Sequence, residues 1–370
     1  MAGARHLYVH VPFCSSRCGY CDFVTVVGRR EGHGAYVDAV LAELQLEGGL
    51  LTDRVETVYV GGGTPTFSDP RELDRLLRSL PRADELTVEA NPETVTVELA
   101  ALLARNRVDR VSIGAQSFNM HLLDVLERRA GPDDVRRAVH RVRDAGIDNI
   151  SLDLIYGIPG QEPADLERDL AEALALEPEH ISAYELEAKP GTRFAHAYGF
   201  ELERRAESME GYFEQVVETL TAAGYRWYET ANFCRPPERA DGRDLRSRHN
   251  LGYWLGHDYL GLGVGAVSTI ENRRWRNAPS LPRYRAALGR GARPPREYEE
   301  LPGSTRASER VLLGLRLDEP LSLAGLADVL DIGELDRLEQ LGLARSGHGS
   351  VALSTRGRFL GDAVTARLLA

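Results

Sequence analysis

Residues 8–23 read YVHVPFCSSRCGYCDF and place Cys14, Cys18 and Cys21 within eight residues, directly after a short β-branched run. Such a run, at residues 6–13, is typical of a buried strand. The three thiols therefore lie on the loop that follows a first strand. The carboxyl end of a strand is where a parallel α/β barrel builds its active site, so this stretch predicts both the fold class and the place of its chemistry.

The pattern of a β-branched run followed by a helical segment recurs along the chain. Five later runs read TVYVGGG, ELTVEAN, RVSIGAQS, NISLDLIYGI and HISAYELEA. Amphipathic helical patterns such as residues 35–46 and 133–145 lie between them. This alternation predicts a parallel sheet with right-handed crossovers, as a partial (β/α)6 TIM-like barrel. A helix at residues 209–223 and the run RWYETANF would add a seventh unit of the same kind.

Two proline-rich stretches, at residues 235–242 and 293–302, indicate domain boundaries. We therefore expect a core barrel at residues 1–235, a connecting segment at 236–298 and a small domain at 299–370. The small domain has three short helical patterns, the turn-linked pair LARSGHGSVAL and a last helix, an order that resembles a winged helix. It has no basic stripe, so we favour a lid or docking role over DNA binding.

Composition narrows the class of protein. A net charge of -11 argues against a general nucleic-acid binder, because phosphate contacts need a surplus of basic residues. No apolar run approaches the roughly 20 residues that span a bilayer, and the first residues lack the hydrophobic segment of a signal peptide. We expect a cytoplasmic protein, with at most a membrane-peripheral partner. In a reducing compartment, clustered thiols indicate metal or redox chemistry rather than disulfides.

The three clustered cysteines leave two kinds of metal site open. A zinc site usually takes four ligands, and the remaining cysteine, Cys234, is far along the chain, so His10 or Asp22 would have to complete the shell. A 4Fe-4S cluster is held by thiolates, and three thiolates would leave one iron free for a non-protein ligand. We expect Cys234 to be a small buried residue outside the site.

The spacing C-x3-C-x2-C of CSSRCGYC, with Tyr20 before the last cysteine, resembles the signature of radical S-adenosylmethionine (SAM) proteins. The resemblance implies a 4Fe-4S cluster on Cys14, Cys18 and Cys21, whose free iron is chelated by the amino and carboxylate groups of SAM. It also implies an electron donor such as a flavodoxin or ferredoxin. Reduction would then cleave SAM to a 5'-deoxyadenosyl radical.

Other strand ends extend the resemblance over most of residues 5–275, to the oxygen-independent coproporphyrinogen III oxidase-like branch. GGGTPT at residues 61–66 is similar to the family's glycine-rich turn after the second strand. Around Arg128, relatives often read L-G-R-x-H-G-P, where this chain has Glu127 and Ala130. The resemblance implies that the following residues contact SAM: Tyr8, Tyr20, Gly62, Gly63, Thr64, Glu89, Gln116, Arg128 and Asp153.

Two kinds of protein share this branch: an oxidase that decarboxylates two propionates of coproporphyrinogen III, and a heme chaperone. The oxidase motif continues to a further cysteine where this chain has Phe23, and the oxidase has a leading extension before its first strand. HNLGYW at residues 249–254 is similar to the H-N-x-x-Y-W motif associated with the chaperones. We therefore expect heme transfer to a hemoprotein acceptor, without coproporphyrinogen III oxidase activity. A radical SAM enzyme of the oxidase type, or a related methyltransferase, is the alternative.

Heme needs a ligand and an apolar surface. His249 could ligate the iron through its imidazole, with Tyr253 and Trp254 stacking on the macrocycle. The same histidine could instead tie this segment to the barrel by hydrogen bonds. His257 is a second candidate ligand. The sequence assigns no catalytic residue and leaves open whether SAM is cleaved or only bound.

Overall fold

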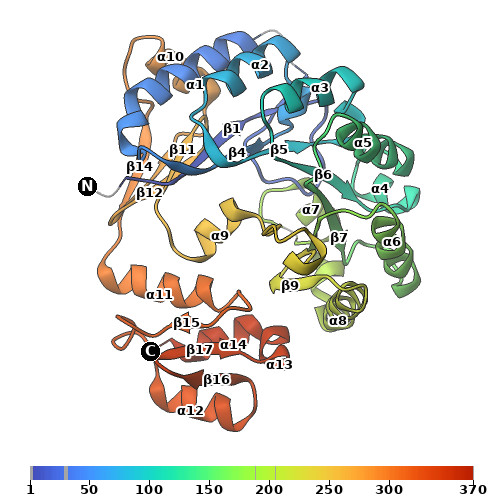
Figure 1. Cartoon of the computed structure of the whole chain (residues 1–370), viewed down its shortest axis with the longest axis vertical. Coiled ribbons are helices and arrows are strands. Elements are labelled where there is room, and N and C mark those ends of the chain that lie inside the picture. Colours follow the sequence, from blue (N-terminus) through green and yellow to red (C-terminus); the bar gives the residue numbers. More distant parts are fainter. Residues whose placement is uncertain (1–2, 29–31, 188, 205, 370) are drawn as a thin grey trace.

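A computed structural model describes residues 3–28, 32–187, 189–204 and 206–369 of the chain. Its main body is a curved twelve-stranded sheet in the order β14-β13-β12-β11-β1-β4-β5-β6-β7-β8-β10-β9 (Figure 1). The parallel centre confirms the expected alternation and consists of β1 (His6–Val11), β4 (Val55–Gly62), β5 (Ala83–Ala90), β6 (Arg110–Gln116), β7 (Ile150–Tyr156) and β8 (His180–Glu185).

Helices cover the outer face of these strands (Figure 1). They are α1 (His33–Glu47), α2 (Pro70–Ser79), α3 (Val97–Arg105), α4 (Met120–Val125), α5 (Pro132–Asp144), α6 (Pro163–Ala175) and α8 (Ala206–Ala222). Helix α7 (Arg193–Arg204) instead begins beside the cysteine loop, where the Phe194 amide donates to the Gly19 carbonyl at 3.1 Å. Short 3-10 turns lie at Gly48–Leu50, Pro65–Phe67, Pro92–Thr94 and Pro237–Arg239. Helix starts are fixed locally: Asp69 accepts from the Arg71 amide ahead of α2, and Thr96 accepts from the Leu99 amide ahead of α3.

Alternation along the strands separates an apolar outer face from a polar inner face. On β1, Leu7 and Val9 are buried in the main hydrophobic core, together with helix residues such as Leu73 and Leu103. His6 and Tyr8, which alternate with Leu7 and Val9, face inward, as do polar side chains on the neighbouring strands. The core therefore lies between sheet and helices, while the inner face is left for polar groups.

The prediction of a seventh βα unit is wrong. After α8, β9 (Arg226–Glu229) and β10 (Asn232–Cys234) form an antiparallel hairpin, and β10 pairs with β8 in the antiparallel direction. The physical reason is the short connection, because two residues can join only antiparallel neighbours, whereas a parallel strand needs a long crossover.

Residues 236–298, expected as a connecting segment, add strands to the same sheet. Helix α9 (Arg248–Trp254) lies on the open inner side, opposite α1 and α2 (Figure 1). The next strand, β11 (Tyr259–Leu262), runs parallel to β1 on its free side. An antiparallel meander with one helix completes the segment: β12 (Val267–Ile270), β13 (Arg273–Asn277), α10 (Leu281–Leu288) and β14 (Arg296–Glu300). The sheet ends at β14 and β9, as a partial barrel.

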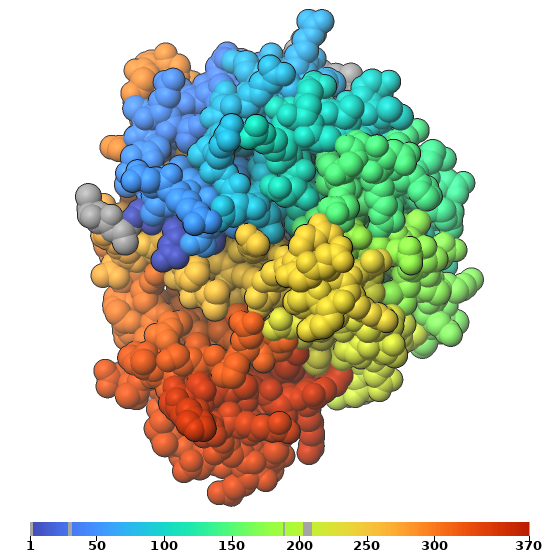
Figure 2. Space-filling model, in the orientation of Figure 1, coloured from blue at the N-terminus to red at the C-terminus, as the bar shows by residue number. Residues whose placement is uncertain are grey.

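The last residues form a smaller lobe beneath the main body, orange to red in Figure 2. It holds α11 (Gly303–Gly314), β15 (Leu321–Ser322), α12 (Ile332–Gln340), β16 (Ala344–Gly347), β17 (Ser350–Leu353), α13 (Thr355–Phe359) and α14 (Gly361–Leu368). A separate hydrophobic cluster around Val311, Leu338 and Val351 supports it. The order of helices and three-stranded sheet is winged-helix-like, as expected. The exact domain boundaries stay predictions.

Ion pairs join the lobe to the barrel. Arg226 on β9 donates to both carboxylate oxygens of Asp318 at 2.7 and 2.9 Å. Arg316 donates to the buried Glu229 at 2.7 Å. Within the described part of the chain, none of the helices combines the length and the apolar character needed to cross a membrane.

Candidate functional site

The cysteine loop is closed at its base by a two-stranded ladder. β2 (Phe13–Cys14) pairs with β3 (Val26–Val27). The Val26 amide donates to the Pro12 carbonyl at 2.7 Å, and the Gly28 amide donates to the Cys14 carbonyl at 3.1 Å. Cys14 is buried, and Cys18 and Cys21 are half-buried. The backbone thus holds the intervening loop, and its thiols, over the carboxyl ends of the parallel strands.

The three cysteines open on one cavity of about 490 Å³. This volume lies in the range, about 300–1,000 Å³, that small-molecule and cofactor sites usually have. Eight of the residues expected to contact SAM also line this cavity, which we call the cysteine cavity: Tyr20, Gly62, Gly63, Thr64, Glu89, Gln116, Arg128 and Asp153. Their roles in cofactor binding stay predictions.

The glycine-rich turn after β4 is required by close packing of the chain. Gly62 has a φ of 110°, and a Cβ there would lie 2.4 Å from the His10 ring. A Cβ on Gly63 would lie 2.7 Å from the carbonyl carbon of Pro12, the residue between β1 and β2 that leads into the cysteine loop. Backbone atoms cannot move aside as a side chain can, so a side chain at Gly63 would displace the cysteine loop itself.

Arg128 brings a cation to the cysteine thiols. One terminal nitrogen donates to the Asn91 amide oxygen at 3.0 Å and to the Gly114 carbonyl at 2.8 Å, and the other lies 3.6 Å from Cys18 Sγ. Its Nε is buried and has no hydrogen-bond partner among the described residues. A buried guanidinium N–H without an acceptor is costly, so Arg128 fits a ligand that brings a carboxylate.

Two carboxylates line the same cavity as Arg128. Glu89 accepts from the Tyr59 hydroxyl at 2.8 Å and from the Gly62 amide at 2.9 Å. Burial nevertheless raises the pKa of Glu89 to about 7, since both bonds only partly offset the desolvation of its charge. Burial also raises the pKa of Asp153, whose oxygens accept from the Ser112 hydroxyl at 3.1 and 3.2 Å. Such carboxylates suit a ligand with amino and hydroxyl donors.

The donor set fits a thiolate-bound cluster. Burial raises the pKa of Cys14 to about 11 and also raises that of Cys21, so metal binding would have to release protons from these thiols. Thr64 donates to Cys14 Sγ at 3.5 Å, and Asn91 in turn donates to the Thr64 hydroxyl at 3.0 Å. These bonds orient a thiolate in the way that outer-shell groups orient metal ligands.

Tyr8 and His249, both expected in cofactor sites, lie outside the lining of the cysteine cavity. They lie behind Tyr59, whose ring stacks on His249 at 5.1 Å between centroids. Both imidazole nitrogens of His249 have partners: Nδ1 lies 2.7 Å from the Thr57 hydroxyl, and Nε2 lies 3.0 Å from the Tyr253 hydroxyl. A role of His249 as heme ligand therefore requires one of these bonds to break.

Several lining residues were not found from the sequence: Tyr59, Asn91, Arg110, Ser112, Ser182 and Tyr184. A signal for most of them was present. Strand residues two positions apart share one face, so Ser112 and Tyr59 lie on the same inner face as their strand neighbours two positions away. Reading every inward position of the strands, instead of motif positions alone, would have identified them.

The departure beside Arg128 has a structural counterpart. Glu127 has a φ of 57°, the left-handed region that favours glycine, and it stands where the pattern that this stretch resembles has glycine. Its carboxylate pairs with Arg193 at the start of α7. The turn thus keeps the glycine-type backbone, and Arg128 still reaches the cavity.

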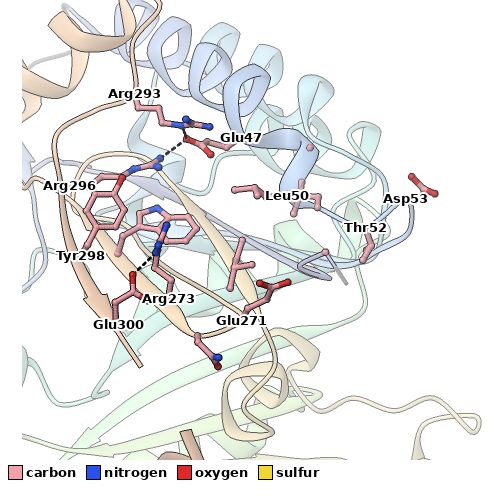
Figure 3. Close-up of a pocket in the computed structure, with 16 residues that line it drawn as sticks. Glu47, Leu50, Thr52, Asp53, Glu271, Arg273, Arg293, Arg296, Tyr298 and Glu300 are labelled. Atoms are coloured by element: carbon pink, nitrogen blue, oxygen red, sulfur yellow. Dashed lines mark hydrogen bonds and ion pairs between the residues drawn. The ribbon is translucent and has the colours of Figure 1, made fainter. Parts of the chain in front are cut away.

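A larger hollow of about 790 Å³ lies beside β13 and β14 at one edge of the sheet (Figure 3). Its arginines are matched by acids. Arg293 donates to Glu47 at 2.7 Å, Arg296 lies 3.0 Å from the same carboxylate, and Arg273 donates to Glu300 at 2.9 Å. Because its arginines are paired with acids, this hollow lacks the open donors found in the cysteine cavity.

Comparison with known proteins also identifies a radical SAM protein. The model of the Radical SAM superfamily matches residues 8–173. The chain is 37% identical to the heme chaperone HemW of Mycobacterium tuberculosis, over 98% of this chain and 94% of that protein. It is 31% identical to the heme chaperone HemW of Bacillus subtilis, over 97% and 98% of the two chains. It is 37% identical to the heme chaperone HemW of Escherichia coli, over 71% and 70%.

Among solved structures, coproporphyrinogen III oxidase (HemN) from Escherichia coli, described as a radical SAM enzyme, superposes with a TM-score of 0.80. The alignment covers 99% of this chain and 90% of the oxidase, at 22% identity. Identity this low supports the fold alone. It shows that the main body and the small lobe have the arrangement found in that protein.

Proposed function

The chain belongs to the radical SAM superfamily and, within it, to the family of the heme chaperone HemW, and on that premise we propose that it binds heme and transfers it to a hemoprotein acceptor. We further propose that it carries a 4Fe-4S cluster and SAM. The observation that supports the cofactors is the single cavity shared by the three thiols and the unpartnered Arg128 Nε.

Each group in the cavity has a role that its chemistry suits. Cys14, Cys18 and Cys21 would hold the cluster as thiolates. Arg128 would pair with the methionine carboxylate of SAM through its free N–H. Glu89 and Asp153 would accept from amino and hydroxyl groups, and Gly62 would let the backbone approach the ligand closely. When bound, the cluster and SAM supply one-electron chemistry, for which the protein provides orientation and exclusion of water.

Likeness to HemW along nearly the whole chain favours the chaperone over an oxidase or methyltransferase. Phe23, where the oxidase motif has a further cysteine, is 56% exposed and lines the cysteine cavity. An apolar side chain there cannot serve as a ligand. We therefore propose that conversion of coproporphyrinogen III is not the activity of this chain.

The partners follow from the same proposal. Reduction of the cluster would need an electron donor such as a flavodoxin or ferredoxin. A cytoplasmic location, with membrane contact only through a peripheral partner, fits such donors and stays a prediction.

The test is anaerobic purification and reconstitution of the full chain, with iron, sulfide and heme measured together. We expect a 4Fe-4S cluster with about four irons per chain, retained heme, and release of that heme to a heme-free hemoprotein such as apomyoglobin. Conversion of coproporphyrinogen III to protoporphyrinogen IX by the reduced, SAM-loaded protein would contradict the proposal. So would a failure of the reconstituted protein to retain heme.

A further inference from the structure

A second cleft lies where the small lobe meets the barrel. Its barrel wall includes Tyr253, His257 and Tyr259, and its lobe wall includes Arg306 and Arg310 of α11. We call it the junction cleft. Its volume is about 410 Å³, again within the range of about 300–1,000 Å³ usual for cofactor sites. It is separate from the cysteine cavity, because none of these residues lines that cavity.

A chain of hydrogen bonds ends at His257 in this cleft. Nδ1 of His257 lies 3.1 Å from Nε2 of His6, and Nδ1 of His6 lies 2.9 Å from the Thr57 hydroxyl. The same hydroxyl lies 2.7 Å from Nδ1 of His249, whose Nε2 is 3.0 Å from the Tyr253 hydroxyl. Among the described residues, no hydrogen-bond partner is found for Nε2 of His257. We call these five residues the histidine relay.

The relay can hold His257 as a neutral ligand. When Nδ1 of His257 carries the proton, it donates to His6, His6 donates to Thr57, and Thr57 donates to His249. His6, Thr57 and His249 then each accept one bond and donate one, His249 to the Tyr253 hydroxyl, while Nε2 of His257 keeps its lone pair free. Metal-binding histidines use this arrangement, with the second ring N–H donated to a fixed acceptor.

The charge of the cleft suits a carboxylate ligand. Arg274 forms two 2.8 Å bonds with Glu309, and Arg306 lies 3.1 Å from Asp258. Arg310 differs, because it donates only to the carbonyls of Ser322 and Ala324, both at 3.0 Å, and has no ion pair among the described residues. Its charge is therefore uncompensated, unlike those of the arginines in the hollow of Figure 3.

We propose that the junction cleft is the heme site of this protein, with Nε2 of His257 as an axial ligand of the iron and Arg310 pairing with a propionate. Tyr253 and Tyr259, whose ring centroids lie 4.5 Å apart, supply the aromatic wall. His249 becomes a positioning residue that acts on His257 through Thr57 and His6. A site open at a domain junction also fits a protein that must release heme. The inference rests on the proposed function.

The experiment is a hemin titration of the full-length, cluster-loaded protein, followed by the Soret band. His257→Ala should weaken binding by about tenfold or more and shift the band, since an axial ligand is lost. Millimolar imidazole should restore the wild-type band in this variant, which a merely structural role would not allow. His140→Ala, at an exposed position on α5, is the matched control and should match the wild type. Equal iron content in all variants confirms that the fold is intact.

Two further variants test the rest of the site. Arg310→Gln should weaken hemin binding without moving the band, while Arg345→Gln on the exposed β16 should have no effect. Thr57→Val interrupts the relay and should weaken binding by about tenfold, the smaller end of the effect of losing an outer-shell bond. A His257→Ala protein with wild-type affinity and Soret band would overturn the inference, while heme binding by that protein would leave the proposed function standing. Absence of heme binding by the wild type would overturn both.

Discussion

The cysteine cavity and the junction cleft position their side chains in opposite ways. In the cavity, the groups come from one short loop and from the carboxyl ends of neighbouring parallel strands, which share one continuous core. In the cleft, they come from α9, β11, the connection between them and α11, so its walls are supported by different hydrophobic clusters. Neighbouring strands that share one core hold their side chains at fixed distances from one another. Two lobes joined by ion pairs can instead move relative to each other. A resident cofactor suits the first arrangement, and a ligand to be handed on suits the second.

The largest expected effect is loss of the cluster. Cys14→Ala, Cys18→Ala or Cys21→Ala should each reduce the content from about four irons per chain to almost none, since a cluster needs all three thiolates. Iron, sulfide and visible absorbance after anaerobic reconstitution measure it. If the cleft is independent of the cavity, hemin should still bind to these variants.

Cys234→Ala is the matched control for the cysteine variants. This thiol is 2% exposed and packs among Tyr228 and Leu251, away from the cavity. It should leave the iron content unchanged. A cluster lost on its removal, or zinc found in place of iron, would contradict the assignment of the ligands.

The different construction of the two regions also explains what the sequence could reveal. Cys14, Cys18 and Cys21 lie within eight residues, and strands such as β4 and β5 are short runs in which apolar residues alternate with polar ones, so the motif and the fold could both be predicted from local sequence. The hairpin of β9 and β10 was missed because helix and strand patterns predict elements, while strand direction depends on the length of the connection.

The junction cleft could not be predicted from the sequence. His6 and His257 are 251 residues apart, and only the pairing of β1 with β11 brings them together. The motif at His249 was recognisable, but its burial behind Tyr59 was not, because the sequence gives no sign of how α9 enters the inner face. Contacts of this kind depend on tertiary packing between distant segments.

A second effect concerns pH and the Glu89 carboxyl of the cavity. Because the pKa of Glu89 is about 7 when folded and ordinary when unfolded, the folded state binds more protons between these values. Its contribution to stability is present below the unfolded pKa and is lost as pH rises through about 7. At about 1.4 kcal/mol per pKa unit, the loss is up to about 3.5 kcal/mol.

Glu89→Gln should remove this dependence. Urea unfolding of the cofactor-free protein at pH 5 and pH 8 measures it, and the variant should lose less stability between the two than the wild type does. Glu93→Gln, at an exposed position a few residues away, should behave as the wild type. Equal pH dependence in the Glu89→Gln protein would show that another group carries the effect.

The affinity for SAM tests whether Arg128 binds this ligand in the cavity. Arg128→Gln should weaken SAM binding by about tenfold, since a hydrogen bond to a charged group contributes about 1.5–3 kcal/mol. Arg129→Gln is the neighbouring control, because Arg129 is exposed. Equilibrium binding of SAM to protein with a full cluster gives the answer. Similar affinities for both variants would place the carboxylate of SAM elsewhere.

The smallest effect should arise at the junction. Asp318 accepts two bonds from Arg226, and both side chains are about one quarter to one third exposed, at 25% and 31%. An ion pair at this exposure contributes about 0.5–1 kcal/mol. Asp318→Asn should therefore loosen the lobe slightly, and hydrogen exchange of the α11 amides should become faster. Because the cavity residues share the core of the barrel, exchange in β4 and β5 and the iron content should not change.

Asp336→Asn, on the exposed side of α12, is the control. Faster exchange in β4 as well would mean that lobe and cavity form one cooperative unit, and the contrast between a fixed and an adjustable region would not hold.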